Sequence, residues 1–101
     1  MYEVIPTGEV RAYLDSLDRA ESKSVMTAIK ALKLIGPNLR RPYYDYLRDG
    51  IFELRARRHR ILYCRQGDRF TLLTVFFKKG ADVPREEIDA ALKMRRQIGA
   101  V

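Results

Sequence analysis

The chain has 101 residues, of which 47% are hydrophobic, and it carries a formal net charge of +7. This length accommodates one domain, residues 1–101, whose core needs neither a metal nor a disulfide. A single cysteine, Cys64, cannot form an internal disulfide. The lack of a leader peptide and of a membrane-length apolar run predicts a cytoplasmic protein that does not contact membranes.

The first part of the chain predicts one short strand and two helices. The strand covers residues 2–5, and apolar side chains at helical spacing then predict a helix over residues 8–17. Asp18 followed by Glu21 predicts a capping pair for the second helix, and Gly36, with the proline after it, is expected to end that helix.

The second part predicts a loop over residues 38–50, three strands over about 51–57, 59–65 and 69–77, and a closing helix after Pro84. The last strand is apolar on both faces, which indicates a central position in the sheet. The predicted order is β-α-α-β-β-β-α. We therefore expect a small α+β domain in which helices pack on an antiparallel sheet.

The excess positive charge lies within one segment, residues 55–79. The segment contains one acid, Asp68, and eight cations, while the other residues hold 12 Lys/Arg and 12 Asp/Glu and balance. The eight cations are Arg55, Arg57, Arg58, Arg60, Arg65, Arg69, Lys78 and Lys79. Because the same segment has the apolar runs of strands, we expect a folded cationic sheet whose natural partner is a polyanion.

Four short motifs in this order resemble the RelE/ParE toxin superfamily, and within it the phage-associated, HigB-like branch. They are Leu47–Arg55 (LRDGIFELR), Arg60–Tyr63 (RILY), Phe77–Lys79 (FKK), and Pro84 followed by a helix. The resemblance implies a RelE-like fold and the toxin of a type II toxin–antitoxin pair. It also implies cleavage of messenger RNA in the ribosomal A site without a metal, and an antitoxin partner, expected to be of the helix-turn-helix type.

Metal-free RNA cleavage of this kind needs cations around one phosphate. The ribose 2′-OH attacks the neighbouring phosphate, so negative charge builds on the phosphoryl oxygens in the transition state. By position in the motifs, Arg55, Arg60 and Lys79 are the candidates for holding that phosphate, and an arginine fork can hold two of its oxygens. His59, the only histidine, is the candidate general base.

Four further residues are candidates for substrate binding: Arg57, Arg58, Lys78 and Tyr63. Each candidate also has an ordinary structural interpretation. Arg55 alternates with Glu53 on what we expect to be the solvent face of its strand, where cations are usually only solvated. The two lysines are also typical of residues that end an apolar strand, and Tyr63 of a core residue. Arg60 shares a face with apolar residues, so it is either paired with a carboxylate or held for phosphate.

Two other functions fit the same fold: a ParE-like inhibitor of DNA gyrase, and a non-catalytic, phage-derived nucleic-acid-binding module. The chain also departs from RelE itself, which has lysines where Ile51 and Glu53 stand and a final-helix tyrosine near the position of Arg85. No zinc-ligand spacing, glycine-rich nucleotide-binding pattern or Ser/His/Asp set occurs, so we expect neither a metal nor another cofactor.

Overall fold

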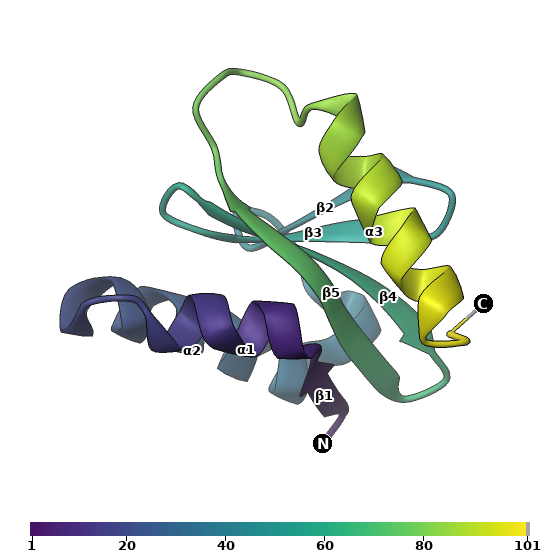
Figure 1. The fold of residues 1–101 in the computed structure, drawn as a ribbon. Coiled ribbons are helices and arrows are strands. Elements are labelled where there is room, and N and C mark those ends of the chain that lie inside the picture. The colour runs from purple at the N-terminus through teal and green to yellow at the C-terminus, as the bar shows by residue number, and fades with distance from the viewer. Residues whose placement is uncertain (101) are drawn as a thin grey trace.

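The computed structural model describes residues 1–100, which form a five-stranded sheet with three α-helices (Figure 1). In chain order the elements are β1 (Glu3–Pro6), α1 (Gly8–Asp15), α2 (Arg19–Ile35), β2 (Tyr44–Arg48), β3 (Ile51–Ala56), β4 (His59–Gln66), β5 (Arg69–Phe77) and α3 (Arg85–Gln97). A single 3-10 turn, Gly36–Asn38, follows α2. None of the helices in this part of the chain has the length and apolarity to cross a bilayer.

The strands lie in the order β1-β5-β4-β3-β2. The predicted α+β class is confirmed, and β2 to β5 pair antiparallel as expected. β1 instead runs parallel to β5, with Glu3 opposite Arg69, so the sheet is mixed. A parallel pair needs a long connection between its strands, and the helices and the β2–β4 strands supply it here.

The predicted loop over residues 38–50 was wrong in part, because Tyr44–Arg48 form the edge strand β2. Tyr44 lies opposite Leu54 and Tyr46 opposite Phe52, so aromatic cross-strand contacts hold the pair together. A two-residue turn, Asp49 and Gly50 with φ of 53° and 77°, joins β2 to β3. An Asp-Gly pair between two strands is a strong hairpin signal, and the sequence therefore contained the evidence for β2.

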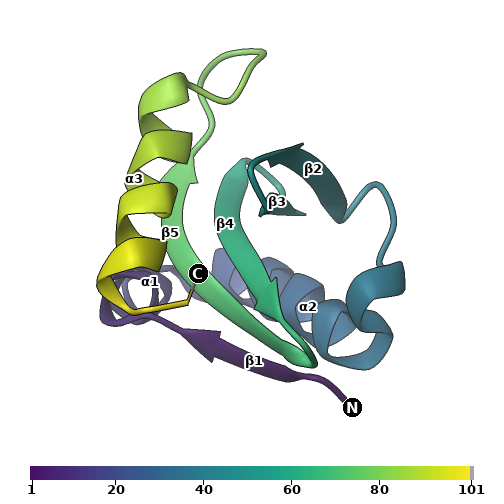
Figure 2. The ribbon, with the colours of Figure 1, turned by 90° about the vertical axis from the view of Figure 1, so that its right-hand side faces the viewer.

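Helices cover both faces of the sheet, so the core has two layers. α1 and α2 pack on one face and α3 on the other (Figure 2). β5 lies second in the strand order, between β1 and β4, and is buried on both faces, so the predicted two-sided burial is confirmed, although the central strand is β4. Capping by Asp18 is also confirmed, since its Oδ1 accepts a hydrogen bond from the Glu21 N–H at 2.9 Å.

Cys64 lies in the layer beneath α3 with only 2% of its surface exposed. Burial raises the pKa of its thiol, and Arg95 opposes this only in part. Because the thiolate is the reactive form, a raised pKa and burial both slow alkylation. We expect the folded protein to resist iodoacetamide at pH 8 and the urea-unfolded protein to react fully, as measured by mass spectrometry. Equal labelling in both states would contradict the buried position.

Candidate active site

Two candidate arginines lie side by side on the sheet face that carries α3. The register places Arg55 of β3 opposite Arg60 of β4, and Arg60 opposite Phe76 of β5. Phe76 belongs to the α3 layer of the core. Because side chains alternate between faces along a strand, these residues form one row across three strands.

Glu53 lies within this row and is fully buried, with 0% of its surface exposed. The expectation that its strand face is open to solvent was therefore wrong. The reason is that the neighbouring residue on this face, Ile51, is itself buried in the α3 layer. A carboxylate without solvent is stable only when cations or hydrogen-bond donors compensate it, and here two arginines do so.

Arg55 is the centre of an ion-pair network that spans β2, β3 and β4. Its Nε donates to Glu53 Oε1 at 2.7 Å and its Nη2 donates to Asp45 Oδ2 at 3.0 Å. Arg41 binds the other oxygen of Asp45 at 3.0 Å, and Arg60 Nε lies 3.7 Å from Glu53 Oε2. Three arginines thus face two carboxylates, which leaves the network with one net positive charge.

The pKa of Asp45 reflects this network. Partial burial alone acts to raise the pKa, but the hydrogen bonds from Arg41 and from the Tyr46 N–H, with the charges of Arg41 and Arg55, together lower it below its ordinary value. The carboxylate therefore stays ionised at neutral pH and holds Arg55 in place. The Nη1 group of Arg55 makes no hydrogen bond within residues 1–100, and 29% of the side chain is exposed.

Arg60 is more deeply placed, with 12% of its side chain exposed. Its Nη1 donates to the carbonyls of Arg57 and His59 in the adjoining turn. Burial lowers the pKa of its guanidinium, the cations Arg55 and Arg58 act in the same direction, and Glu53 opposes them. The group nevertheless remains protonated, as arginine does in proteins.

Two buried polar atoms at this point have no hydrogen-bond partner among the described residues: Glu53 Oε2 and Arg60 Nε. Unsatisfied buried polar groups are rare and costly, and a functional role is one of the explanations for them. A site with more cationic than anionic groups, and with an unused arginine donor, is suited to an additional anion such as a phosphodiester.

His59 lies on the opposite face of the sheet from Arg55 and Arg60. It is 3% exposed, its Nδ1 is 2.9 Å from the Tyr13 hydroxyl, and its Nε2 is 3.6 Å from Glu21 Oε1. His59 is therefore a buried residue that lies against Tyr13 of α1 and Glu21 of α2. The structure does not bring His59 together with the arginine pair that it was predicted to assist.

Tyr63 is a core residue, the structural alternative raised for it above. Only 2% of its surface is exposed, and its ring stacks on Phe52 with centroids 5.4 Å apart. Burial raises the pKa of its hydroxyl, with Tyr44 adding to the effect. The proposed substrate contact is therefore not available in this conformation, because the ring presents no surface to a ligand.

The remaining candidates gather at the end of the sheet around the β3–β4 turn. Arg57 has φ of 56° and pairs with Glu21 at 3.0 Å. Arg58 Nε donates to the Lys78 carbonyl at 2.8 Å, and its guanidinium lies 5.8 Å from the Phe77 ring centroid. Lys78 is half-buried and Lys79 is exposed, and neither forms an ion pair with any residue the structure describes.

Half of the eight cations in residues 55–79 have a carboxylate partner nearby. Four of the eight have a carboxylate within ion-pair distance: Arg55, Arg57, Arg60 and Arg69. The surface is therefore less positive than the count along the sequence indicates. The cations without such a partner in residues 1–100 include both lysines at the end of β5, which lie next to the β3–β4 turn.

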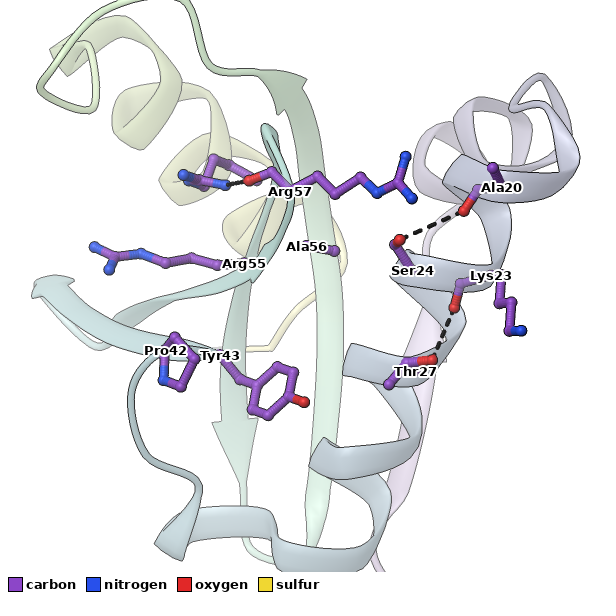
Figure 3. A pocket seen from close by; sticks show the side chains of 10 residues that line it. Ala20, Lys23, Ser24, Thr27, Pro42, Tyr43, Arg55, Ala56 and Arg57 are labelled. Atoms are coloured by element: carbon purple, nitrogen blue, oxygen red, sulfur yellow. Dashed lines mark hydrogen bonds between the residues drawn. The ribbon is translucent and has the colours of Figure 1, made fainter.

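A cleft of about 770 Å³ opens between α2 and the end of β3 (Figure 3). β2 begins at Tyr44, so the edge of β3 beyond Arg55 has no neighbouring strand. Figure 3 shows Arg55 pointing away from α2, Arg57 reaching toward α2, and the Tyr43 ring projecting into the space between. Arg60 also lines the cleft, which is thus continuous with the arginine pair.

Comparison with protein families shows to which family the chain belongs. A family model described as "Phage derived protein Gp49-like (DUF891)" matches residues 12–96. The chain belongs to this Gp49-like family. The match covers the arginine pair, its carboxylate partners and the cleft, and it confirms the expected phage association.

Solved structures show the fold that this Gp49-like protein shares. A chain of the YoeB-YefM complex from Staphylococcus aureus aligns with a TM-score of 0.61 and 12% identity, covering 78% of the present chain and 99% of the other. A second, heterotetrameric YoeB-YefM toxin-antitoxin complex from the same organism gives 0.58 and 15%, covering 80% and 99%. At this identity the matches show a common fold, that of the YoeB toxin. No curated protein matches the sequence.

Two residues of the Gp49-like site were missed from the sequence: Glu53 and Asp45. Both are acids, whereas the motifs and the excess charge pointed to cations. The available signal was the spacing Glu53-x-Arg55, which puts a carboxylate and a cation on one strand face. Among residues 1–100, no group of three or more His, Cys, Asp or Glu side chains is arranged to hold a metal ion.

Proposed function

We propose that this Gp49-like protein is the toxin of a type II toxin–antitoxin pair and cleaves messenger RNA on the ribosome without a metal. The observation that carries the proposal is the network of Arg55, Glu53 and Arg60. It presents two adjacent guanidiniums, one net positive charge and unsatisfied polar atoms on one sheet face. The fold shared with YoeB and the motifs of the RelE/ParE superfamily, HigB-like branch, support the same function.

In the proposed reaction the ribose 2′-OH attacks the adjacent phosphorus and the bond to the 5′-oxygen of the next nucleotide breaks. The products are a 2′,3′-cyclic phosphate and a free 5′-OH. Arg55 Nη1 and the outer nitrogen of Arg60 donate to the phosphoryl oxygens, where charge increases in the transition state. Lys79, which follows β5, adds a flexible cation at the same end of the sheet, with Lys78, Arg57 and Arg58 in support.

The geometry also gives a reason for dependence on the ribosome. Glu53 is fully buried and His59 lies on the other face, so neither is placed to take the proton of the 2′-OH. The chain then contributes binding and charge stabilisation, and the ribosome supplies the orientation of the RNA and the remaining proton transfer. Positioning of this kind provides a large part of the acceleration in such reactions.

The proposed partner is an antitoxin that covers the cationic end of the sheet. The structural neighbours come from complexes of YoeB with YefM, and a protein that cleaves cellular RNA needs such an inhibitor. In the HigB-like arrangement the antitoxin is a helix-turn-helix protein. Since the proposed target is the ribosome, we propose that the protein acts in the cytoplasm.

The lack of a positioned base favours a second candidate, a ParE-like gyrase inhibitor, which would bind its target and perform no chemistry. A brief induction of the protein in cells, followed by mapping of transcript ends, separates the two. Cuts inside translated codons are expected for the endonuclease. Intact transcripts with DNA damage would instead support gyrase inhibition, and normal growth at verified expression would contradict both toxin functions.

Salt dependence of ribosome binding is a further prediction. Five cations are placed to meet phosphates: Arg55, Arg58, Arg60, Lys78 and Lys79. For single-stranded RNA the logarithm of affinity falls with the logarithm of salt at about −0.7 per phosphate, so we expect a slope of about −3.5. Filter binding over a range of KCl concentrations measures it. A slope near zero would mean that these cations are only solvated surface.

A further inference from the structure

The cleft between α2 and β3 contains groups besides the arginine pair that could bind a ligand. Its ionisable lining apart from Tyr43 is entirely cationic: Lys23, Arg55, Arg57 and Arg60. No carboxylate lines it, although Glu21 pairs with Arg57 at its border. A space of about 770 Å³ is within the range of roughly 300–1,000 Å³ that is usual for small-ligand sites.

The aromatic group in the cleft is Tyr43. The residue is 38% exposed, and its hydroxyl makes no hydrogen bond to any described residue. Its backbone is fixed, since the Tyr43 carbonyl accepts from the Arg55 N–H at 2.7 Å. A partly exposed ring on a fixed backbone, directly before β2 and next to Arg55 of β3, is suited to stacking on a base.

The helix wall of the cleft offers acceptors. Ser24 and Thr27 point toward β3 in Figure 3, and their hydroxyl hydrogens are donated to the Ala20 and Lys23 carbonyls of their own helix. Their oxygens keep free lone pairs, which accept from base amino groups or a ribose hydroxyl but cannot donate to a phosphate. Lys23 lies at the outer rim of the same wall; its side chain is exposed, is directed away from β3 in Figure 3, and has no ion-pair partner in residues 1–100.

We propose that this cleft binds the nucleotide next to the cleaved phosphodiester, with its base stacked on Tyr43 and its outer phosphate held by Lys23. The proposal rests on the RNA-cleaving function proposed above and adds a subsite to it. The order of groups fits one strand of RNA: the reacting phosphate at Arg55 and Arg60, the base at Tyr43, and the next phosphate at the rim of α2. The lining contains no Leu, Ile, Val or Phe, and its purely apolar residues are two alanines and Pro42, so the cleft suits a flat base better than a bulky aliphatic side chain.

Binding of two short probes to the purified protein tests this subsite. The first is a 2′-O-methyl RNA hexamer, which cannot be cleaved because the attacking hydroxyl is blocked. The second is an abasic hexamer with the same phosphates and no bases. Fluorescence anisotropy at several salt concentrations gives affinity and salt slope for each probe.

Tyr43→Ala is expected to weaken binding of the RNA hexamer by roughly 5- to 150-fold, the value of one base stack, and to leave the abasic hexamer within about twofold. Tyr43→Phe keeps the ring and should bind like the unchanged protein. Lys23→Ala should make the salt slope shallower by about 0.7 with both probes. Lys30→Ala is the matched control, because Lys30 is exposed on α2 outside the cleft, and its slope should not change.

Several results would overturn the subsite. They are unchanged hexamer binding by Tyr43→Ala, equal effects of Lys23→Ala and Lys30→Ala, or a hexaglutamate peptide that binds as tightly as RNA with the same dependence on Tyr43. The last would assign the cleft to an acidic protein segment. Ribosomal cleavage with no effect of Tyr43→Ala would remove the subsite and leave the endonuclease, whereas Tyr43-dependent binding without cleavage would support the subsite and remove the endonuclease.

Discussion

Arg55→Ala is expected to lower the single-turnover rate of mRNA cleavage on programmed ribosomes by roughly 30- to 1,000-fold. This corresponds to about 2–4 kcal/mol of transition-state stabilisation, the usual cost of removing one well-placed donor. Arg55 is the arginine with an unused Nη1 and a partly open side chain. Its loss therefore removes a donor from the phosphate and not only a surface charge.

Arg55 also neutralises two acids, so the alanine variant needs a structural check. Without it, Asp45 keeps Arg41, but Glu53 keeps only Arg60 at 3.7 Å. Arg55→Lys is the second variant, because it retains the positive charge and loses the two-pronged geometry. We expect it to fold normally by circular dichroism and to lose most of the activity.

Arg69→Ala is the matched control for charge. Arg69 pairs with exposed Glu3 at the opposite end of β5, and its removal should change the rate by less than about twofold, through long-range attraction alone. Equal losses for Arg55→Ala and Arg69→Ala would mean that general charge drives activity. Unchanged activity of a folded Arg55→Lys variant would show that the guanidinium fork is not used.

The elements that could be predicted from the sequence are those fixed by neighbours in the chain. The Asp18 cap, the Gly36 stop and the apolar run of β5 are local signals, and each was placed within about two residues. The parallel pairing of β1 was not predictable in this way, because its partner strand, β5, begins at Arg69, far from β1 in the sequence.

The site shows the same division. Motif order selected Arg55 and Arg60 as candidates, which remains a prediction. Strand alternation placed Arg60 on one face with Leu62 and Cys64, and the α3 layer confirms that face. Alternation alone did not show which faces are covered, so buried Glu53 was expected at the surface. His59 was the candidate general base for the site that contains Arg60. The two residues are adjacent in one strand, however, and adjacent residues of a strand point to opposite faces, so strand alternation alone separates them.

Glu53→Gln is expected to lower the free energy of unfolding by about 3 kcal/mol, the low end for breaking a buried ion pair by removing one partner. The glutamine keeps the shape of the side chain and an acceptor for Arg55, but it leaves Arg60 buried without a counter-charge. For a domain of this size the loss corresponds to roughly 12–24 °C in Tm by thermal melting. Asp82→Asn is the control: Asp82 is an exposed acid without an ion pair in residues 1–100, so its replacement should change Tm little.

A double variant decides whether the Glu53 effect comes from Arg60 or from a loss of packing. Arg60→Met replaces the guanidinium with an apolar chain of similar length, and together with Glu53→Gln it removes both charges of the pair. If the cost arises from an unpaired buried cation, the double variant should be less destabilised than the sum of the two single variants, by about 1 kcal/mol or more. Additive losses would mean that Glu53 and Arg60 act independently despite their 3.7 Å separation. An unchanged Tm in Glu53→Gln would remove Glu53 as the support of the arginine pair.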